Sequence, residues 1–121
     1  MKRMIMADDD SHARDALADY MRSSMPHVYV EQVADGNQLV ERVRNHTYDL
    51  VLTDNEMQEL GGLAAIQGIR EFNKRVPIIM LAGSSSREEA IKAGATGYVS
   101  KSNWQEDLPP VLRDYLGSFL G

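Results

Sequence analysis

Near the N-terminus the sequence reads "MIMADDDSHAR", from Met4 to Arg14. A short apolar run ends at three consecutive aspartates, and apolar residues at helical spacing follow them. This order predicts a buried strand, a charged turn and a helix. Three adjacent carboxylates repel one another, so we expect a cation to lie close to the turn.

The same alternation of strand and helix continues to the end of the chain. The predicted strands span residues 3–7, 28–33, 50–53, 78–81 and 97–99. Apolar spacing predicts helices around Ala13, Ala16, Leu17, Tyr20 and Met21, around Leu39, Val40 and Val43, around Leu63, Ile66 and Ile69, over 86–93, and around Leu108, Val111, Leu112, Tyr115, Leu116 and Phe119. Parallel strands require right-handed helical crossovers. We therefore predict a flavodoxin-like, doubly wound (βα)5 α/β fold, with a five-stranded parallel sheet in the order 2-1-3-4-5 and helices on both faces.

Some boundaries can be predicted more closely. Ser86 followed by Glu89 forms a capping-box pattern, and the helix that it opens is expected to stop at Gly94. The prolines at 109–110 belong in a first helical turn, where a missing N–H costs little, so the last helix is expected to start near Asp107. The runs "VYV", "LVL" and "IIML" are typical of strands that are buried on both faces.

Composition limits the class of protein. The chain has 121 residues, of which 43% are hydrophobic, and this predicts one domain spanning residues 1–121. The absence of cysteine excludes disulfides and thiolate metal sites and is compatible with a reducing cytoplasm. The formal net charge of -5 argues against nucleic acid or an anionic membrane as a partner. The apolar run before Asp8 is too short for a signal-peptide core or a membrane span, so we expect a cytoplasmic domain.

The charged residues of interest lie where predicted strands end. The first strand is followed by Asp8, Asp9 and Asp10, the third by Asp54 and the fifth by Lys101. In an open parallel sheet of this order, ligands bind beyond the carboxyl ends of the strands, between the first and third. Carboxylates beside one lysine suit Mg²⁺, which takes one or two carboxylates and accepts phosphate oxygens. Without the metal, repulsion is expected to raise the pKa of at least one of these carboxyls.

On these residues the chain resembles the receiver domains of two-component response regulators over essentially its whole length. The resemblance also includes the segments "EMQELGGL", "VPIIML" and "AGATGYVSKS", with a loop glycine at Gly62. It implies that the phosphoryl group is accepted by Asp54, that Mg²⁺ is bound by Asp9, by Asp54, by the backbone carbonyl of Glu56 and through water by Asp8, and that the phosphoryl oxygens are contacted by Lys101. A domain of this kind is not an enzyme, since it assists only its own phosphorylation and dephosphorylation.

The resemblance implies the partners as well. The phosphoryl group is expected from the phosphohistidine of a sensor histidine kinase or a phosphotransfer protein, and the signal is expected to pass to a downstream protein or output domain. Attack by Asp54 requires the charge of the transferring phosphoryl group to be neutralised, which is the task of a metal and a lysine.

The chain departs from the family pattern at the switch residues. Family members usually have serine or threonine at the end of the fourth strand, where this chain has Ala82, so the usual hydroxyl link to the phosphoryl group is expected to be missing. Ser84 and Ser85 follow in the loop, and either Ser84 or Ser85 is a candidate substitute. Tyr98 matches the switch aromatic residue, with plain packing as its alternative role. The interval from Ala82 to Lys101 is short for the family, which predicts a short or displaced fourth helix.

Two positions lack a proline that is common in the family, Gln58 and Ser102. A cis bond before Ser102 would cost roughly 2.5–4 kcal/mol without proline. The isomer of the Lys101–Ser102 bond therefore stays open at this point.

Two alternatives to a switching receiver remain. One is a non-switching pseudo-receiver, an interaction module that keeps the pocket, and Ala82 is the feature that favours it. The other is a haloacid-dehalogenase-type phosphatase, which would use Asp8 and Asp10 as nucleophile and acid but usually needs a larger fold. Asp10 by itself is expected to cap a helix, with Ser11 as the rival cap.

Overall fold

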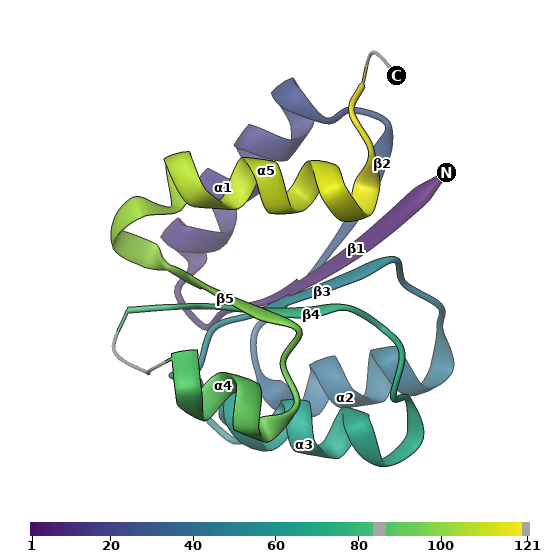
Figure 1. Ribbon diagram of the computed structural model, residues 1–121, viewed down its shortest axis with the longest axis vertical. Coiled ribbons are helices and arrows are strands. Elements are labelled where there is room, and N and C mark those ends of the chain that lie inside the picture. The colour runs from purple at the N-terminus through teal and green to yellow at the C-terminus, as the bar shows by residue number, and fades with distance from the viewer. Residues whose placement is uncertain (84–86, 120–121) are drawn as a thin grey trace.

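The structure is a computed structural model that describes residues 1–83 and 87–119. Its strands are β1 (Lys2–Ala7), β2 (Val28–Val33), β3 (Leu50–Thr53), β4 (Ile78–Ala82) and β5 (Gly97–Ser100). Its helices are α1 (Ser11–Ser24), α2 (Gly36–Asn45), α3 (Gly62–Phe72), α4 (Arg87–Ala93), the short 3₁₀ helix η1 (Lys101–Asn103) and α5 (Trp104–Leu116). Figure 1 shows one sheet between two helical layers, with α1 and α5 over one face and α2, α3 and α4 over the other. None of the helices in these described ranges is long and apolar enough to cross a membrane.

The sheet has the predicted topology. Its five strands are parallel and lie in the order β2-β1-β3-β4-β5, which confirms the predicted fold class. In β1, Ile5 is paired with Glu31 of β2 on one side and with Val51 of β3 on the other. The winding of the chain reverses between β1 and β3, so the carboxyl ends of these two strands form the switch point at which such sheets bind ligands.

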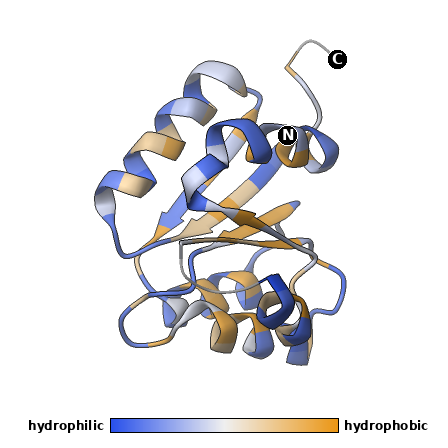
Figure 2. Ribbon diagram, turned by 60° about the vertical axis from the view of Figure 1, so that its left-hand side comes forward, coloured by the Kyte–Doolittle hydropathy of each residue, from blue (hydrophilic) through white to orange (hydrophobic). Residues whose placement is uncertain are grey.

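Alternate residues of the strands pack into two cores, one on each face. In β1, Ile5 and Ala7 face α2 and α3, whereas Met4 and Met6 face α1 and α5. Every residue of β3 and β4 is buried, which confirms the expectation for "LVL" and "IIML". In Figure 2 the hydrophobic colour lies along the central strands and on parts of the helices on both sides of the sheet. The strand ends that carry the site are therefore held from both sides.

The expectation that "VYV" is buried on both faces is wrong. Strand β2 is an edge strand in which Val28 and Val30 are half-buried and Tyr29 is 50% exposed. Since only β1 pairs with it, the helices cover its faces incompletely. The Tyr29 ring lies instead against Arg3, whose guanidinium carbon is 5.5 Å from the ring centroid.

The start of α1 follows the sequence expectation. The Asp10 carboxylate accepts a hydrogen bond from the backbone amide of His12 at 2.9 Å, so Asp10 is the cap and Ser11 is the first residue of the helix. The buried face differs by one position, because Ala18 is buried together with Leu17 and Met21, whereas the predicted Ala16 is exposed.

Helix α4 is short, as predicted, with seven residues. It ends before Gly94, which has a left-handed φ of 119° that suits glycine. The capping-box residue Ser86 lies outside the described residues.

The prediction for the start of the last helix is wrong. Helix α5 begins at Trp104 rather than near Asp107, and the prolines at 109–110 lie inside it. The carbonyls four residues before these prolines belong to exposed residues. Water can therefore donate hydrogen bonds to them in place of the missing N–H groups. The helix ends at Leu116, and Phe119, which was expected on its apolar face, lies beyond it and is 59% exposed.

Two glycines hold the loop after β3 against neighbouring helices. The Gly36 amide donates to the Leu60 carbonyl at 3.0 Å, and a Cβ at Gly36 would collide with that carbonyl oxygen. The Gly62 amide donates to the Asn55 carbonyl at 2.8 Å, and a Cβ at Gly62 would collide with the carbonyl oxygen of Asp54. Both contacts require a residue without a side chain, so α2 and α3 begin close against this loop.

Candidate functional site

The site is built from residues at the carboxyl ends of β1, β3 and β5. The backbone extends the sheet ladder past the strand ends, since the Asp8 amide donates to the Val33 carbonyl at 3.2 Å and the Asp54 amide donates to the Ala7 carbonyl at 2.9 Å. Asp8 and Asp54 are both buried. The sheet therefore fixes the backbone of these two carboxylates next to each other.

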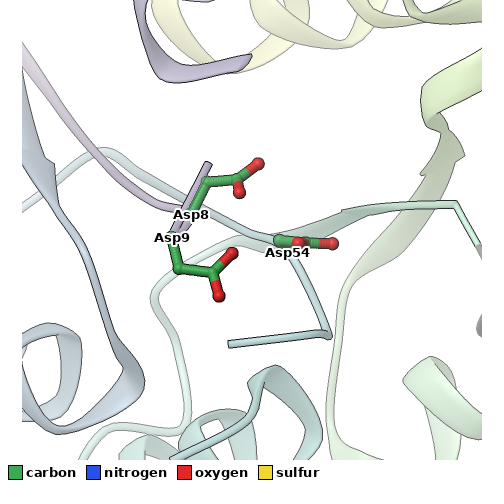
Figure 3. A group of neighbouring side chains, drawn as sticks. All are labelled: Asp8, Asp9 and Asp54. Carbon is green, nitrogen blue, oxygen red and sulfur yellow. The ribbon is translucent and has the colours of Figure 1, made fainter. Parts of the chain in front are cut away.

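Three carboxylates meet at this edge. One oxygen from each of Asp8, Asp9 and Asp54 lies within 4.8 Å of the others, and Asp9 is the exposed member of the group. Figure 3 shows the Asp8 and Asp9 side chains diverging from consecutive positions, with Asp54 beside them on the neighbouring strand end. Asp10 is exposed and its carboxylate caps α1. The three-aspartate run therefore divides into two cluster residues and one helix cap.

Lys101 connects the two buried carboxylates. Its Nζ donates to Asp8 Oδ2 at 2.7 Å and lies 3.3 Å from Asp54 Oδ2. The other oxygens bond to the backbone: Asp8 Oδ1 accepts from the Asp10 amide at 2.9 Å, and Asp54 Oδ1 accepts from the Asn55 amide at 2.8 Å. Since each carboxylate oxygen can accept more than one bond, the cluster keeps free acceptor capacity.

The electrostatics of the cluster agree with the expected charge crowding. Burial and the charge of Asp8 raise the pKa of the Asp54 carboxyl above its ordinary value, although Lys101 and the Asn55 amide act in the opposite direction. Burial by itself would lower the pKa of Lys101, but its bond to Asp8 and the charges of both carboxylates raise it overall. The direction at Asp54 agrees with the prediction that repulsion raises at least one carboxyl pKa, but burial is the larger cause.

The donor set fits a hard divalent cation. Three carboxylates and one lysine leave excess negative charge, and the ligand atoms are all oxygens, which Mg²⁺ prefers. Beside them is an open hollow of about 460 Å³, which we call the polar hollow. It is lined by Asp9, Asp10, Asp54, Glu56, Met57, Gln58 and Lys101. This hollow has room for a cation, its waters and a phosphate-sized group, and Glu56 is among the residues that line it.

The switch positions lie next to this site. Ala82 is buried at the end of β4 and pairs in register with Ser100 of β5. The Tyr98 hydroxyl donates to the Ala82 backbone carbonyl at 3.3 Å, so the expected switch aromatic contacts the residue that stands where the family has serine or threonine. The candidate substitutes Ser84 and Ser85 lie outside the described residues. The Lys101–Ser102 bond is trans, since the described residues contain no cis peptide bond.

Sequence reasoning does not single out one further residue at this edge, Arg14. Its Nη1 donates to the backbone carbonyl of Asp8 at 2.6 Å, so α1 holds the strand end from the side. The position of Arg14 four residues after the cap Asp10, on the helix that follows the acidic run, is the only signal that points to this contact.

A doubly wound sheet with an acidic cluster and a lysine at its switch point defines a receiver-type signalling domain. The family model for the response regulator receiver domain matches residues 4–113. The chain belongs to this family of two-component signalling domains.

Individual relatives agree with that assignment. The transcriptional regulatory protein ZraR of Escherichia coli (strain K12) is 39% identical over 69 residues, covering 54% of this chain and 16% of ZraR. The receiver domain of the sensor histidine kinase PA1611 from Pseudomonas aeruginosa, with magnesium in its active-site cleft, has a TM-score of 0.85 at 29% identity, covering 97% of this chain and 98% of that one. TrrA from Thermotoga maritima, in complex with Mg²⁺ and BeF, has a TM-score of 0.85 at 27% identity, covering 96% of this chain and 100% of that one. The chain spans only 10–16% of the length of the first curated relatives that it matches.

Proposed function

We propose that this receiver accepts a phosphoryl group on Asp54 from the phosphohistidine of a sensor histidine kinase or a phosphotransfer protein. The observation that carries the proposal is the contact of Lys101 with Asp8 and Asp54 beside a cluster of three carboxylates. The proposed Mg²⁺ ligands are Asp9, Asp54 and the Glu56 backbone carbonyl, with Asp8 acting through water. The Mg²⁺ and Mg²⁺–BeF complexes of the two structural relatives, at 29% and 27% identity, support this choice of metal.

The chemistry is a displacement at phosphorus. An Asp54 carboxylate oxygen attacks the phosphoryl group, the P–N bond to the histidine breaks, and the imidazole leaves with the electron pair of that bond. The metal, when bound, supplies positive charge to the phosphoryl oxygens. Lys101 already lies beside Asp54 and supplies a second positive charge there, and the sheet holds Asp54 in place for attack. The product is an acyl phosphate, which hydrolysis resets.

The test is to label the protein with acetyl phosphate and to titrate it with beryllofluoride, both in the presence of Mg²⁺. We expect the wild type to gain one phosphoryl mass and to bind beryllofluoride, and Asp54→Asn to do neither. Asp15→Asn, at an exposed position of α1, is the matched control and should behave as the wild type. Labelling that survives in Asp54→Asn would show that the acceptor has been assigned to the wrong residue.

We infer that this receiver signals onward by an atypical route. Alanine cannot donate a hydrogen bond to the phosphoryl group, and the Tyr98 hydroxyl already bonds to the Ala82 backbone carbonyl. The second candidate function, a non-switching interaction module, rests on the same two features. It predicts the same amide NMR spectrum for Tyr98 and α4 with and without beryllofluoride, whereas a switching receiver predicts changes there. Ala82→Thr, which restores the family hydroxyl, is the comparison variant.

The remaining proposals concern context. We propose that residues 1–121 form a single cytoplasmic domain that binds neither nucleic acid nor membrane, and that its output goes to a downstream protein or a linked output domain. The two cores on opposite faces of one sheet support a single folding unit. Limited proteolysis should leave residues 4–113 intact if this is correct.

A further inference from the structure

A second hollow lies on the other side of the Lys101 contacts, between α1 and the start of α5. We call it the apolar hollow, and its volume is about 160 Å³. Its walls include Leu17, Leu52, Leu81 and Trp104. Its polar end includes Asp8, Asp54 and Lys101, of which Asp54 and Lys101 also line the polar hollow. Figure 3 shows the Asp8 carboxylate turned away from that of Asp9 and toward the layer of α1 and α5. The buried ends of β1 and β3 therefore separate two hollows of different character.

The size and lining of this hollow suit a small ring or branched aliphatic group. An apolar cavity of about 150 Å³ admits a molecule of the size of benzene. Trp104 forms one side, and its indole is itself fixed by an edge-to-face contact with Tyr20, with ring centroids 6.0 Å apart. A ligand ring can therefore pack between a held indole and aliphatic side chains without rearranging the core.

Arg14 supplies a further cation at the polar end of the apolar hollow. Arg14 lines the hollow and is half-buried, and its Nη1 donates to a neutral acceptor, the Asp8 backbone carbonyl. Within residues 1–83 and 87–119, no carboxylate lies within ion-pairing distance of its guanidinium. An arginine presents five donors in a fork that matches a carboxylate, so the remaining donors favour an organic anion.

We propose that the apolar hollow binds a small organic carboxylate with a compact aromatic or branched aliphatic body. The carboxylate pairs with Arg14, and the body lies between Leu17, Leu52 and Trp104. Since Asp54 lines both hollows, the bound anion adds negative charge beside it and slows phosphoryl acceptance. That regulatory consequence rests on the proposed function of Asp54, whereas the binding does not.

The first experiment measures binding alone. Trp104 is the only tryptophan of the chain, so its fluorescence reports on the apolar hollow directly. Benzoate is the probe, titrated without Mg²⁺ or phosphodonor, with benzyl alcohol and benzylamine as neutral and cationic molecules of similar shape. We expect a saturable fluorescence change with benzoate, at least about tenfold weaker binding of benzyl alcohol, and no saturation with benzylamine. An absence of saturable benzoate binding, or equal binding of the three probes, would overturn the proposal.

Two pairs of variants locate the binding. Ala16→Phe places a ring at the exposed edge of the hollow and should abolish benzoate binding, whereas Ala64→Phe, on the exposed surface of α3, should not. Arg14→Gln should weaken benzoate binding about tenfold or more, whereas Arg22→Gln, farther along the same helix, should leave it unchanged. Benzoate binding that is unchanged in both Ala16→Phe and Arg14→Gln would place the ligand elsewhere and sink the assignment.

The regulatory arm is measured separately. Benzoate at saturation should slow labelling of Asp54 by acetyl phosphate in the wild type but not in Ala16→Phe. If benzoate binds without slowing the labelling, the coupling to Asp54 is refuted and the assignment of the binding site stands. Failure of the phosphoryl-acceptor assignment would show instead as an absence of labelling without benzoate, so the two failures are distinguishable.

Discussion

Glu31 and Asp54 are both mostly buried carboxylates, with side chains 11% and 8% exposed, yet their surroundings are opposite. Glu31 has three partners: ion pairs with Arg3 and Arg42 and a hydrogen bond from the Tyr48 hydroxyl at 2.8 Å. Asp54 accepts a bond from the Asn55 amide and shares a single lysine with a second carboxylate, Asp8.

The pKa directions follow the surroundings. At Glu31, burial acts to raise the pKa, but the bonds from Tyr48 and Arg3 outweigh it and hold the pKa below its ordinary value. At Asp54, burial and the neighbouring Asp8 prevail and the pKa is raised. The fold thus satisfies one buried charge fully and leaves the other under-compensated, at the edge where an external cation can reach it. We therefore expect the Glu31 contacts to contribute stability and the Asp54 edge to be available for a cation.

The largest expected effect on stability is at Glu31, the carboxylate whose charge is fully compensated. Glu31→Gln removes the charge that two arginines and one tyrosine share, so we expect the free energy of unfolding to fall by about 1.5–3 kcal/mol. Urea unfolding measures this change, with the exposed Glu41→Gln of α2 as the control. Equal stabilities of the two variants would mean that the Glu31 contacts contribute nothing net, and the contrast with Asp54 would disappear.

At the candidate site, removing the carboxylate charge is expected to increase the stability rather than to decrease it. In EDTA, Asp54→Asn removes a charge that the folded state disfavours, so we expect stability to rise by about 1 kcal/mol. Added Mg²⁺ should stabilise the wild type and leave Asp54→Asn nearly unchanged. A lower melting temperature of Asp54→Asn in EDTA would show that the Lys101 contact outweighs burial and repulsion.

Acidification should reduce the stability difference between the wild type and each of the two variants, Glu31→Gln and Asp54→Asn, over different pH ranges. The lowered pKa of Glu31 contributes stability above the ordinary value of 4.5, and this is lost as the pH falls through the folded-state pKa. The raised pKa of Asp54 means that its cost is present at neutral pH and is relieved as the pH falls from the folded-state pKa to the ordinary 3.8. Urea unfolding across this range should show the advantage of Asp54→Asn fading at higher pH than the deficit of Glu31→Gln. The reverse order would contradict the assigned directions.

The smallest effect concerns the tyrosine of the satisfied cluster. Burial and the hydrogen bond to Glu31 raise the pKa of Tyr48 to about 12. Phenolate absorbance during an alkaline titration should therefore contain a late step near that pH. Tyr48→Phe should remove the step, and Glu31→Gln should move it to lower pH. A late step that persists in Tyr48→Phe would belong to another tyrosine.

Much of the fold and the site could be predicted because both depend on strand ends. The alternation of apolar runs and helical spacing determines a parallel sheet, and a parallel sheet brings Asp8, Asp54 and Lys101 to one edge whatever their separation in the chain. The cap at Asp10 could also be predicted, since it depends on local backbone geometry alone.

The features that could not be predicted from the sequence depend on contacts between distant elements or on access of water. The start of α5 at Trp104 depends on two prolines being tolerated where water serves the freed carbonyls, and a local rule on proline cannot detect that. The Glu31 cluster and the Arg14 contact join side chains from different elements, so they depend on rotamers and on neighbours that only the assembled fold supplies.

The two glycines against the loop after β3 affect how mutational data on this domain should be interpreted. A side chain at Gly62 would press on the carbonyl of Asp54, and one at Gly36 would press on the loop that carries Glu56. In a saturation mutagenesis survey, both positions would tolerate as little change as the acceptor itself, although neither glycine takes part in any chemistry. Loss of function on substitution of these glycines therefore reflects the close approach of two backbone segments. It can be distinguished from loss of phosphoryl acceptance only when folding and labelling are measured independently.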